Sequence, residues 1–205
     1  MTDAEKRKQA VEDTEEIDKY VTFTLRKKLT KEIKKYNKFP RVFKTTYTTK
    51  NRNKYYLMFN VKDRATLDRG YWVNVYTIMD TEEGKYAMIA VSQASVIESF
   101  QIYAPHLFSR YTQRYGVQMY EEERIHKFME DNIELEYGGL RCEDGKAMAK
   151  VNGGAILGDV EGDIIVFKTF VDDSLLREEQ MEYGESIIDS FNERVELFKK
   201  IFKKK

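Results

Sequence analysis

The periodicity of the apolar residues changes near Pro40, and this change constrains the fold more than any other feature of the chain. Before it, apolar side chains recur every four residues, at Ile17, Val21, Leu25, Leu29 and Ile33. This spacing is typical of the buried face of a helix, which the β-branched segment 21–24 is expected to bend or divide. After it, apolar and polar residues alternate, as in strands. The sequence therefore predicts an α+β protein with a long N-terminal helix.

Five strands are expected between residues 41 and 103, and the polar turns at 50–54 and 80–84 join four of them into two hairpins. Strands that follow one another along the chain usually pair, so the predicted sheet is an antiparallel meander. The remaining elements are predicted by helical periodicity, by Asn-Gly and Glu-Gly turns and by capping residues: a central helix pair in 105–132, strands in 146–171 and C-terminal helices in 174–203. We expect an N-terminal helical arm over residues 1–38 and an α+β domain over residues 39–205.

The net charge of zero hides a segregation of charge along the chain. Residues 26–54 contain twelve Lys and Arg with one acidic residue, whereas residues 159–196 contain twelve Asp and Glu with three basic residues. Two interpretations stay open: the segments pair within the fold or with a neighbouring copy, or the basic segment binds an acidic partner such as nucleic acid.

The composition predicts the cellular compartment of the protein. No apolar run approaches the length of a membrane span, and the first residues lack the features of a secretory signal. The single cysteine, Cys142, cannot form an intrachain disulfide or a multi-cysteine zinc site. We expect a cytoplasmic protein that needs no membrane.

A helix that begins at Pro105 carries one of only two histidines in the chain. In the expected helix, His106 and Arg110 share one face with Arg114 beside them, while Leu107 and Tyr111 lie on the opposite, apolar face. The partial positive charge of a helix N-terminus attracts anions and disfavours an imidazolium. This helix therefore predicts either a neutral imidazole beside a phosphate-sized anion site or simply the solvated face of an amphipathic helix.

Two further groups of residues are weaker candidates for a site. The tip of the first hairpin combines basic and aromatic side chains, Lys50, Arg52, Lys54, Tyr47 and Tyr55, and could bind nucleic acid by charge and stacking or be a soluble hairpin end. A possible metal-ligating spacing occurs at Glu122, His126 and Glu130, but such spacing is also normal on exposed helix faces. We expect no metal and no cofactor.

The segment from about Ile102 to Val171 resembles the superfamily of metal-independent ribonucleases and toxins that includes barnase, EndoU and RelE-type toxins. The resembling features are His106, Arg110 and Arg114 at the start of a helix, a second helix, and strands of which the last ends in Lys168-Thr169-Phe170. The resemblance implies RNA cleavage through the ribose 2′-hydroxyl without a metal. His106 would be the general base, the two arginines would hold the phosphate, and Lys168 with Thr169 would assist from the facing strand. A bacterial or mobile-element protein fits this resemblance.

The alternative is a non-catalytic binding or assembly protein. Its terminal amphipathic helices and segregated charge would bind RNA, a protein partner or a second copy of the chain. Whether the protein is an enzyme depends on convergence, because catalysis requires His106, Arg110 and Lys168 to meet within about 8 Å of one another.

Overall fold

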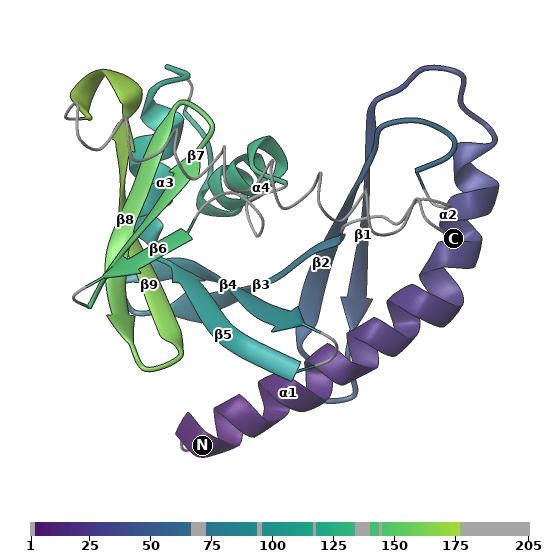
Figure 1. The fold of residues 1–205 in the computed structure, drawn as a ribbon, viewed down its shortest axis with the longest axis horizontal. Helices are drawn as coiled ribbons and strands as arrows, with labels where there is room; N and C mark the ends of the chain where they lie inside the picture. The colour runs from purple at the N-terminus through teal and green to yellow at the C-terminus, as the bar shows by residue number, and fades with distance from the viewer. Residues whose placement is uncertain are drawn as a thin grey trace, which may run out of the picture. The chain divides into compact units, whose positions relative to one another are not determined.

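The computed structural model divides the chain into two compact units, unit 1 over Met1–Ile102 and unit 2 over Tyr103–Lys205 (Figure 1). The structure describes residues 3–66, 73–93, 96–116, 118–133, 140–143 and 145–176. Both units contain helices and antiparallel strands, so the predicted α+β class is confirmed. The C-terminal helices predicted over 174–203 lie outside the described residues, apart from the end of the 3₁₀ turn η3 at Asp173–Leu175.

Unit 1 begins with one continuous helical run (Figure 1). It consists of α1 (Asp3–Tyr20), the π-helical segment η1 (Val21–Leu25) and α2 (Arg26–Ile33). A four-residue apolar spacing drifts by about 40° per step around an α-helix of 3.6 residues per turn. The wider π turn takes in one more residue and offsets this drift. Ile17, Leu25 and Ile33 are therefore all buried on the same side of the helical run. The π-helical segment lies where the β-branched residues 21–24 were expected to bend or divide the helix.

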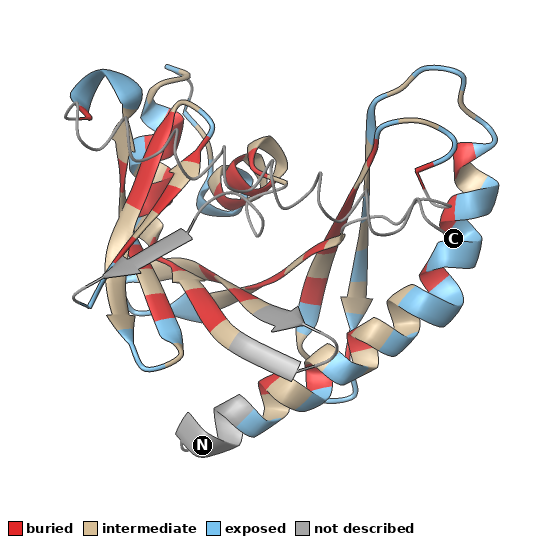
Figure 2. Ribbon diagram, viewed as in Figure 1, coloured by how far each residue is buried: buried red, intermediate tan, exposed pale blue. Residues whose placement is uncertain are grey.

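The helical run packs on the sheet of unit 1, which contains β1 (Arg41–Thr48), β2 (Lys54–Val61), β3 (Val73–Thr81), β4 (Gly84–Gln93) and β5 (Val96–Tyr103). These strands are neighbours in the order of the sequence, as predicted. Alternate residues of β2, from Tyr55 to Val61, are buried against Leu25, Leu29 and Ile33. The helical arm thus belongs to the same compact unit as the strands, and Figure 2 shows its buried residues on one side and its exposed residues on the other.

Unit 2 contains α3 (Pro105–Gln113), α4 (Glu121–Asp131), β6 (Leu140–Glu143), β7 (Lys146–Val151), β8 (Gly154–Glu161) and β9 (Ile164–Asp172). Its strands lie in the order β9-β8-β7-β6. Aromatic rings join α3 to the sheet: Tyr111 lies 5.2 Å from Phe170 of β9, between ring centroids. Phe108 lies 6.5 Å from Tyr103, the last residue of β5, whose ring is 5.2 Å from Phe167 of β9. One face of β9 is therefore covered by α3.

A β-bulge in β9 determines which way Lys168 points. Phe167 pairs with Gly158 and Thr169 pairs with Leu157, so Lys168 is an extra residue without a place in the ladder. The insertion shifts the alternation, which is why both Phe167 and Phe170 are buried although they are three residues apart. Lysine was unexpected within this apolar strand, and the bulge accounts for its exposure.

No helix within the described residues is long and apolar enough to cross a membrane.

Candidate functional site

The exposed face of α3 carries the predicted histidine. His106 and Arg110 are both exposed, one helical turn apart, while Leu107 and Tyr111 are fully buried. The predicted division of this helix into a packed face and a solvated face is confirmed. The N-cap residue is Ala104, whose methyl group cannot accept a hydrogen bond from the N–H groups of the first turn.

Arg114, at the end of α3, is bound to the protein itself. Its Nη1 donates to the carbonyl of Asn152 in the β7–β8 turn, and its Nη2 donates to the hydroxyl of Tyr115 at 2.9 Å. The guanidinium carbon lies 3.9 Å from the centroid of the Tyr111 ring. A Cβ at Gly153 would lie 1.9 Å from Nη1, so the arginine occupies the space that this glycine leaves. Arg114 therefore clamps α3 to the turn between two strands.

The two tyrosines that contact Arg114 also bind a carboxylate that sequence reasoning missed. Asp131, at the end of α4, accepts hydrogen bonds from the hydroxyls of Tyr111 (2.8 Å) and Tyr115 and from the ammonium of Lys127. Burial raises the pKa of Asp131, but these three hydrogen bonds outweigh it, so the pKa lies below its usual value. No spacing rule indicates this cluster, because its members come from two helices brought together by packing.

Replacing Arg114 by alanine is expected to destabilise the protein by about 1–3 kcal/mol, because the Asn152 carbonyl and the Tyr111 ring lose their partner. The matched control is His106→Ala, which removes an exposed side chain from the same helix and should change stability by less than about 0.5 kcal/mol. Urea unfolding followed by circular dichroism measures both. Equal stability of the two variants would show that the clamp is unimportant.

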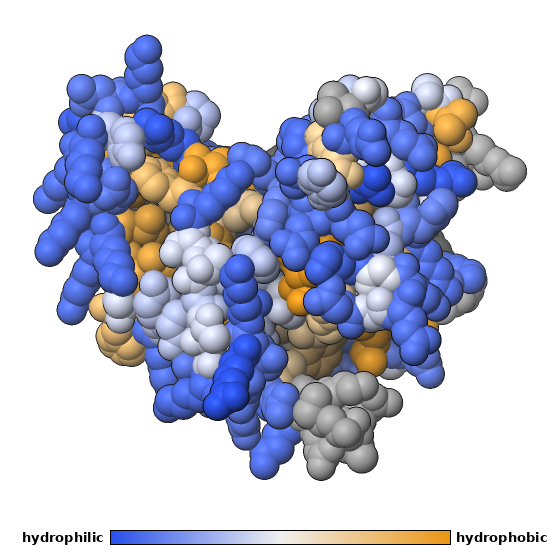
Figure 3. All heavy atoms as spheres, turned by 180° about the vertical axis from the view of Figure 1, so that it is seen from behind, coloured by the Kyte–Doolittle hydropathy of each residue, from blue (hydrophilic) through white to orange (hydrophobic). Residues whose placement is uncertain are grey.

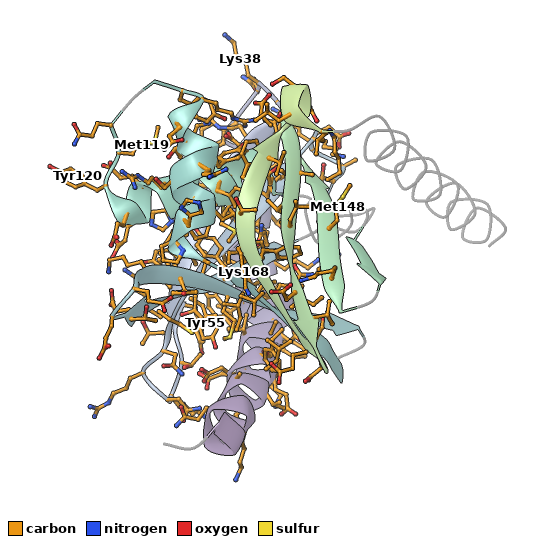
Figure 4. All side chains as sticks on the ribbon, turned by 90° about the vertical axis from the view of Figure 1, so that its left-hand side faces the viewer. Lys38, Tyr55, Met119, Tyr120, Met148 and Lys168 are labelled. Carbon is orange, nitrogen blue, oxygen red and sulfur yellow. The ribbon has the colours of Figure 1, made fainter. Side chains whose placement is uncertain are left out.

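Lys168 lies on the sheet face opposite the one that α3 covers. Figure 4 labels Lys168 on the ribbon. The ammonium of Lys168 donates to Asp159 of β8. Asp159 pairs with Val166, which alternates with the buried Ile165 and Phe167, so its carboxylate points away from α3. Thr169 is half-buried in β9. The structure thus brings His106 and Arg110 together on one helix face and leaves Lys168 on the far side of the sheet.

Asp159 provides a titration test of this arrangement. Hydrogen bonds from Lys146 (2.7 Å) and Lys168 lower the pKa of Asp159 to about 2. The ion pairs therefore contribute fully to stability above about pH 4, which is close to the usual pKa of an aspartate. Their contribution is lost as the pH falls towards 2. We expect Lys168→Met to raise the pKa of Asp159, measured by NMR of its carboxyl carbon. Lys150→Met, which removes a lysine bonded to Asp173, should leave it unchanged; an equal shift in both variants would contradict the assignment.

The tyrosines of the first hairpin are occupied by α1. Tyr55 is only 5% exposed, and its hydroxyl donates to Asp13 at 3.1 Å. Tyr47 stacks on Tyr20 with 4.3 Å between ring centroids. Its hydroxyl donates to Glu16 at 2.7 Å. Tyr55 is therefore not open to a nucleic-acid base and Tyr47 already has a stacking partner, so stacking at this tip is not supported by the structure, although Lys50, Arg52 and Lys54 are exposed.

Cations are concentrated instead on α2 and the residues that follow it. We define the basic surface as Arg26, Lys27, Lys28, Lys31, Lys34, Lys35, Lys38 and Arg41, all of which are exposed. The stripe at Leu25, Leu29 and Ile33 is packed on β2, so the cations occupy the remaining circumference of the helix. Arg41 lies over the ring of Tyr36, 3.8 Å from its centroid. The face that Figure 3 shows is largely hydrophilic, with hydrophobic areas between the hydrophilic side chains.

Among the described residues, no three side chains of His, Cys, Asp or Glu are arranged to hold a metal ion, and this includes Glu122, His126 and Glu130 of α4. No family model, no curated protein and no solved structure matches the chain. The resemblance to metal-independent ribonucleases therefore stays a prediction. The class that the fold and the exposed charge define is an α+β protein with a basic helical surface.

Proposed function

We propose that this protein binds nucleic acid through the basic surface and does not cleave it. The observation that carries the proposal is the exposure of eight cations within residues 26–41. The one carboxylate in that stretch, Glu32, accepts from Lys35 at 2.7 Å. Phosphate backbones bind such clusters because each phosphate that contacts a cation releases a condensed counterion.

The acidic segment gives further support for an external partner. In its described part, Asp159 is bonded to Lys146 and Lys168, and Asp173 is bonded to Lys150. These carboxylates are thus paired with lysines of unit 2, their own unit. The contacts of these two carboxylates therefore favour an outside polyanion over them as the partner of the basic segment.

The catalytic alternative finds little support in the contacts of the residues predicted to carry it. A general base needs phosphate-binding groups and a general acid around the reacting atoms. Arg114 is committed to the Asn152 carbonyl, and Lys168 lies across the sheet from α3. Only His106 and Arg110 of the predicted set share an exposed surface.

Fluorescence anisotropy with labelled RNA at increasing salt tests the proposal. We expect binding at low salt that weakens steeply as salt is added. The same RNA is incubated with the protein, with and without EDTA, beside the His106→Ala variant. We expect intact RNA throughout. Cleavage that resists EDTA and disappears in His106→Ala would replace this proposal by the ribonuclease one, and absence of binding at low salt would refute it.

A further inference from the structure

Phe23 is exposed at the start of the basic surface, between Lys19 and Lys27 along the helical run. Its relative exposure is 67%, and it lies in η1, two residues before Leu25, which is buried against the sheet. Two residues along a helix turn the side chain towards the opposite side, so Phe23 points away from the core. Lys19 lies about one turn before it and Lys27 about one turn after it, and both are exposed.

A single exposed apolar residue needs no explanation by itself. Two features distinguish Phe23. It lies in a π-helical segment, a local structure that often occurs at functional sites. The basic surface also begins directly after Phe23, because Arg26 and Lys27 follow it on the next turn. A flat ring flanked by ammonium and guanidinium groups offers stacking and phosphate contacts side by side.

We propose that the basic surface binds single-stranded nucleic acid and that a base stacks on Phe23. This inference rests on the proposed function and specifies its ligand. In a single strand the bases can leave their neighbours and lie on an aromatic ring, whereas in a duplex they are stacked and paired inside. The cations on α2 hold the backbone while Phe23 binds a base.

A membrane surface is the other polyanion that a basic helix with an exposed phenylalanine could bind. An interfacial helix inserts its apolar face into lipid, but the apolar stripe of η1 and α2, formed by Leu25, Leu29 and Ile33, is already packed on β2. One phenylalanine remains for insertion, which favours the single strand.

The test compares four variants of the full chain by anisotropy, using a labelled uridine homopolymer and an RNA duplex of equal length. Because stacking of one base on an aromatic side chain is worth about 1–3 kcal/mol, Phe23→Ala should weaken binding to the single strand by roughly 5- to 150-fold. Duplex binding and the salt dependence should not change, since the cations remain. Phe23→Trp should retain tight binding, whereas Phe23→Leu should behave like the alanine variant. Tyr120→Ala is the control, because Tyr120 is an 83% exposed aromatic residue in unit 2.

Each adverse outcome has a separate meaning. Single-strand binding that is unchanged in Phe23→Ala, or retained in Phe23→Leu, would overturn stacking and leave the proposed function intact. Failure of the wild-type protein to bind either RNA at low salt would overturn both. Binding to phosphatidylserine vesicles that depends on Phe23, without RNA binding, would replace the single strand by a membrane.

Discussion

Replacing Lys27, Lys31 and Lys34 by glutamine is expected to weaken binding of single-stranded RNA several hundredfold at about 50 mM salt. All three lysines are exposed on the basic surface. For a single strand, affinity varies with salt to the power of about −0.7 per phosphate contact, so each contact contributes roughly eightfold at this salt concentration. The slope of log K against log salt should become shallower by about 2.

The control removes the same number of charges elsewhere. Lys146→Gln, Lys150→Gln and Lys168→Gln together remove three lysines that are bonded to Asp159 or Asp173 on the strands of unit 2. Because carboxylates already offset these charges, we expect little change in affinity. Equal loss in the two triple variants would mean that RNA responds to net charge and that the basic surface is not a binding site.

Replacing Asp13 by alanine is expected to lower the free energy of unfolding by about 2–4 kcal/mol. Asp13 is fully buried and accepts hydrogen bonds from Asn51 (3.0 Å), Asn53 (2.7 Å) and Tyr55 (3.1 Å). Its loss leaves the buried Tyr55 hydroxyl without an acceptor and removes one of the links between α1 and the first hairpin. Urea unfolding monitored by circular dichroism gives the difference.

Two further variants identify the cause of that loss. Glu16→Ala, on the same helix, removes the acceptor of Tyr47, which is only partly buried, and should cost about 1 kcal/mol or less. Tyr55→Phe should cost less in the Asp13→Ala background than in the wild type, because the hydroxyl there has already lost its acceptor. Additive effects of Asp13→Ala and Tyr55→Phe would show that their hydrogen bond contributes little.

Most helices and strands in the described residues were predictable because their patterns are local. Alternation identified β1 and β2, and Pro105 identified the start of α3. The four residues of β6, Leu140–Glu143, were missed because they are too few to show a period and two of them are charged.

The candidate site was less predictable because its contacts are distant in sequence. Tyr47 and Tyr55 look like stacking residues until Glu16 and Asp13 are placed beside them, 31 and 42 residues away. The sequence predicts Arg114 as a phosphate ligand, whereas in the structure it donates to the carbonyl of Asn152, 38 residues away. The basic surface was visible as a charged segment, but only the packing of Leu29 on β2 shows which way its cations face.

The π turn at Val21–Leu25 and the bulge at Lys168 each add one residue to an otherwise regular element. Each acts as a phase correction: one keeps the buried stripe of a helix on its sheet, and the other keeps Phe167 and Phe170 on the helix side of a strand. The orientation of every side chain beyond such a point depends on a count of residues rather than on their chemistry. Deleting Thr22 or Lys168 would thus remove the extra residue and leave a regular helix or ladder with the same buried face, whereas deleting a residue elsewhere in either element would turn the following segment out of register. In this protein, chain length between contacts is itself a determinant of which surface is presented to a partner.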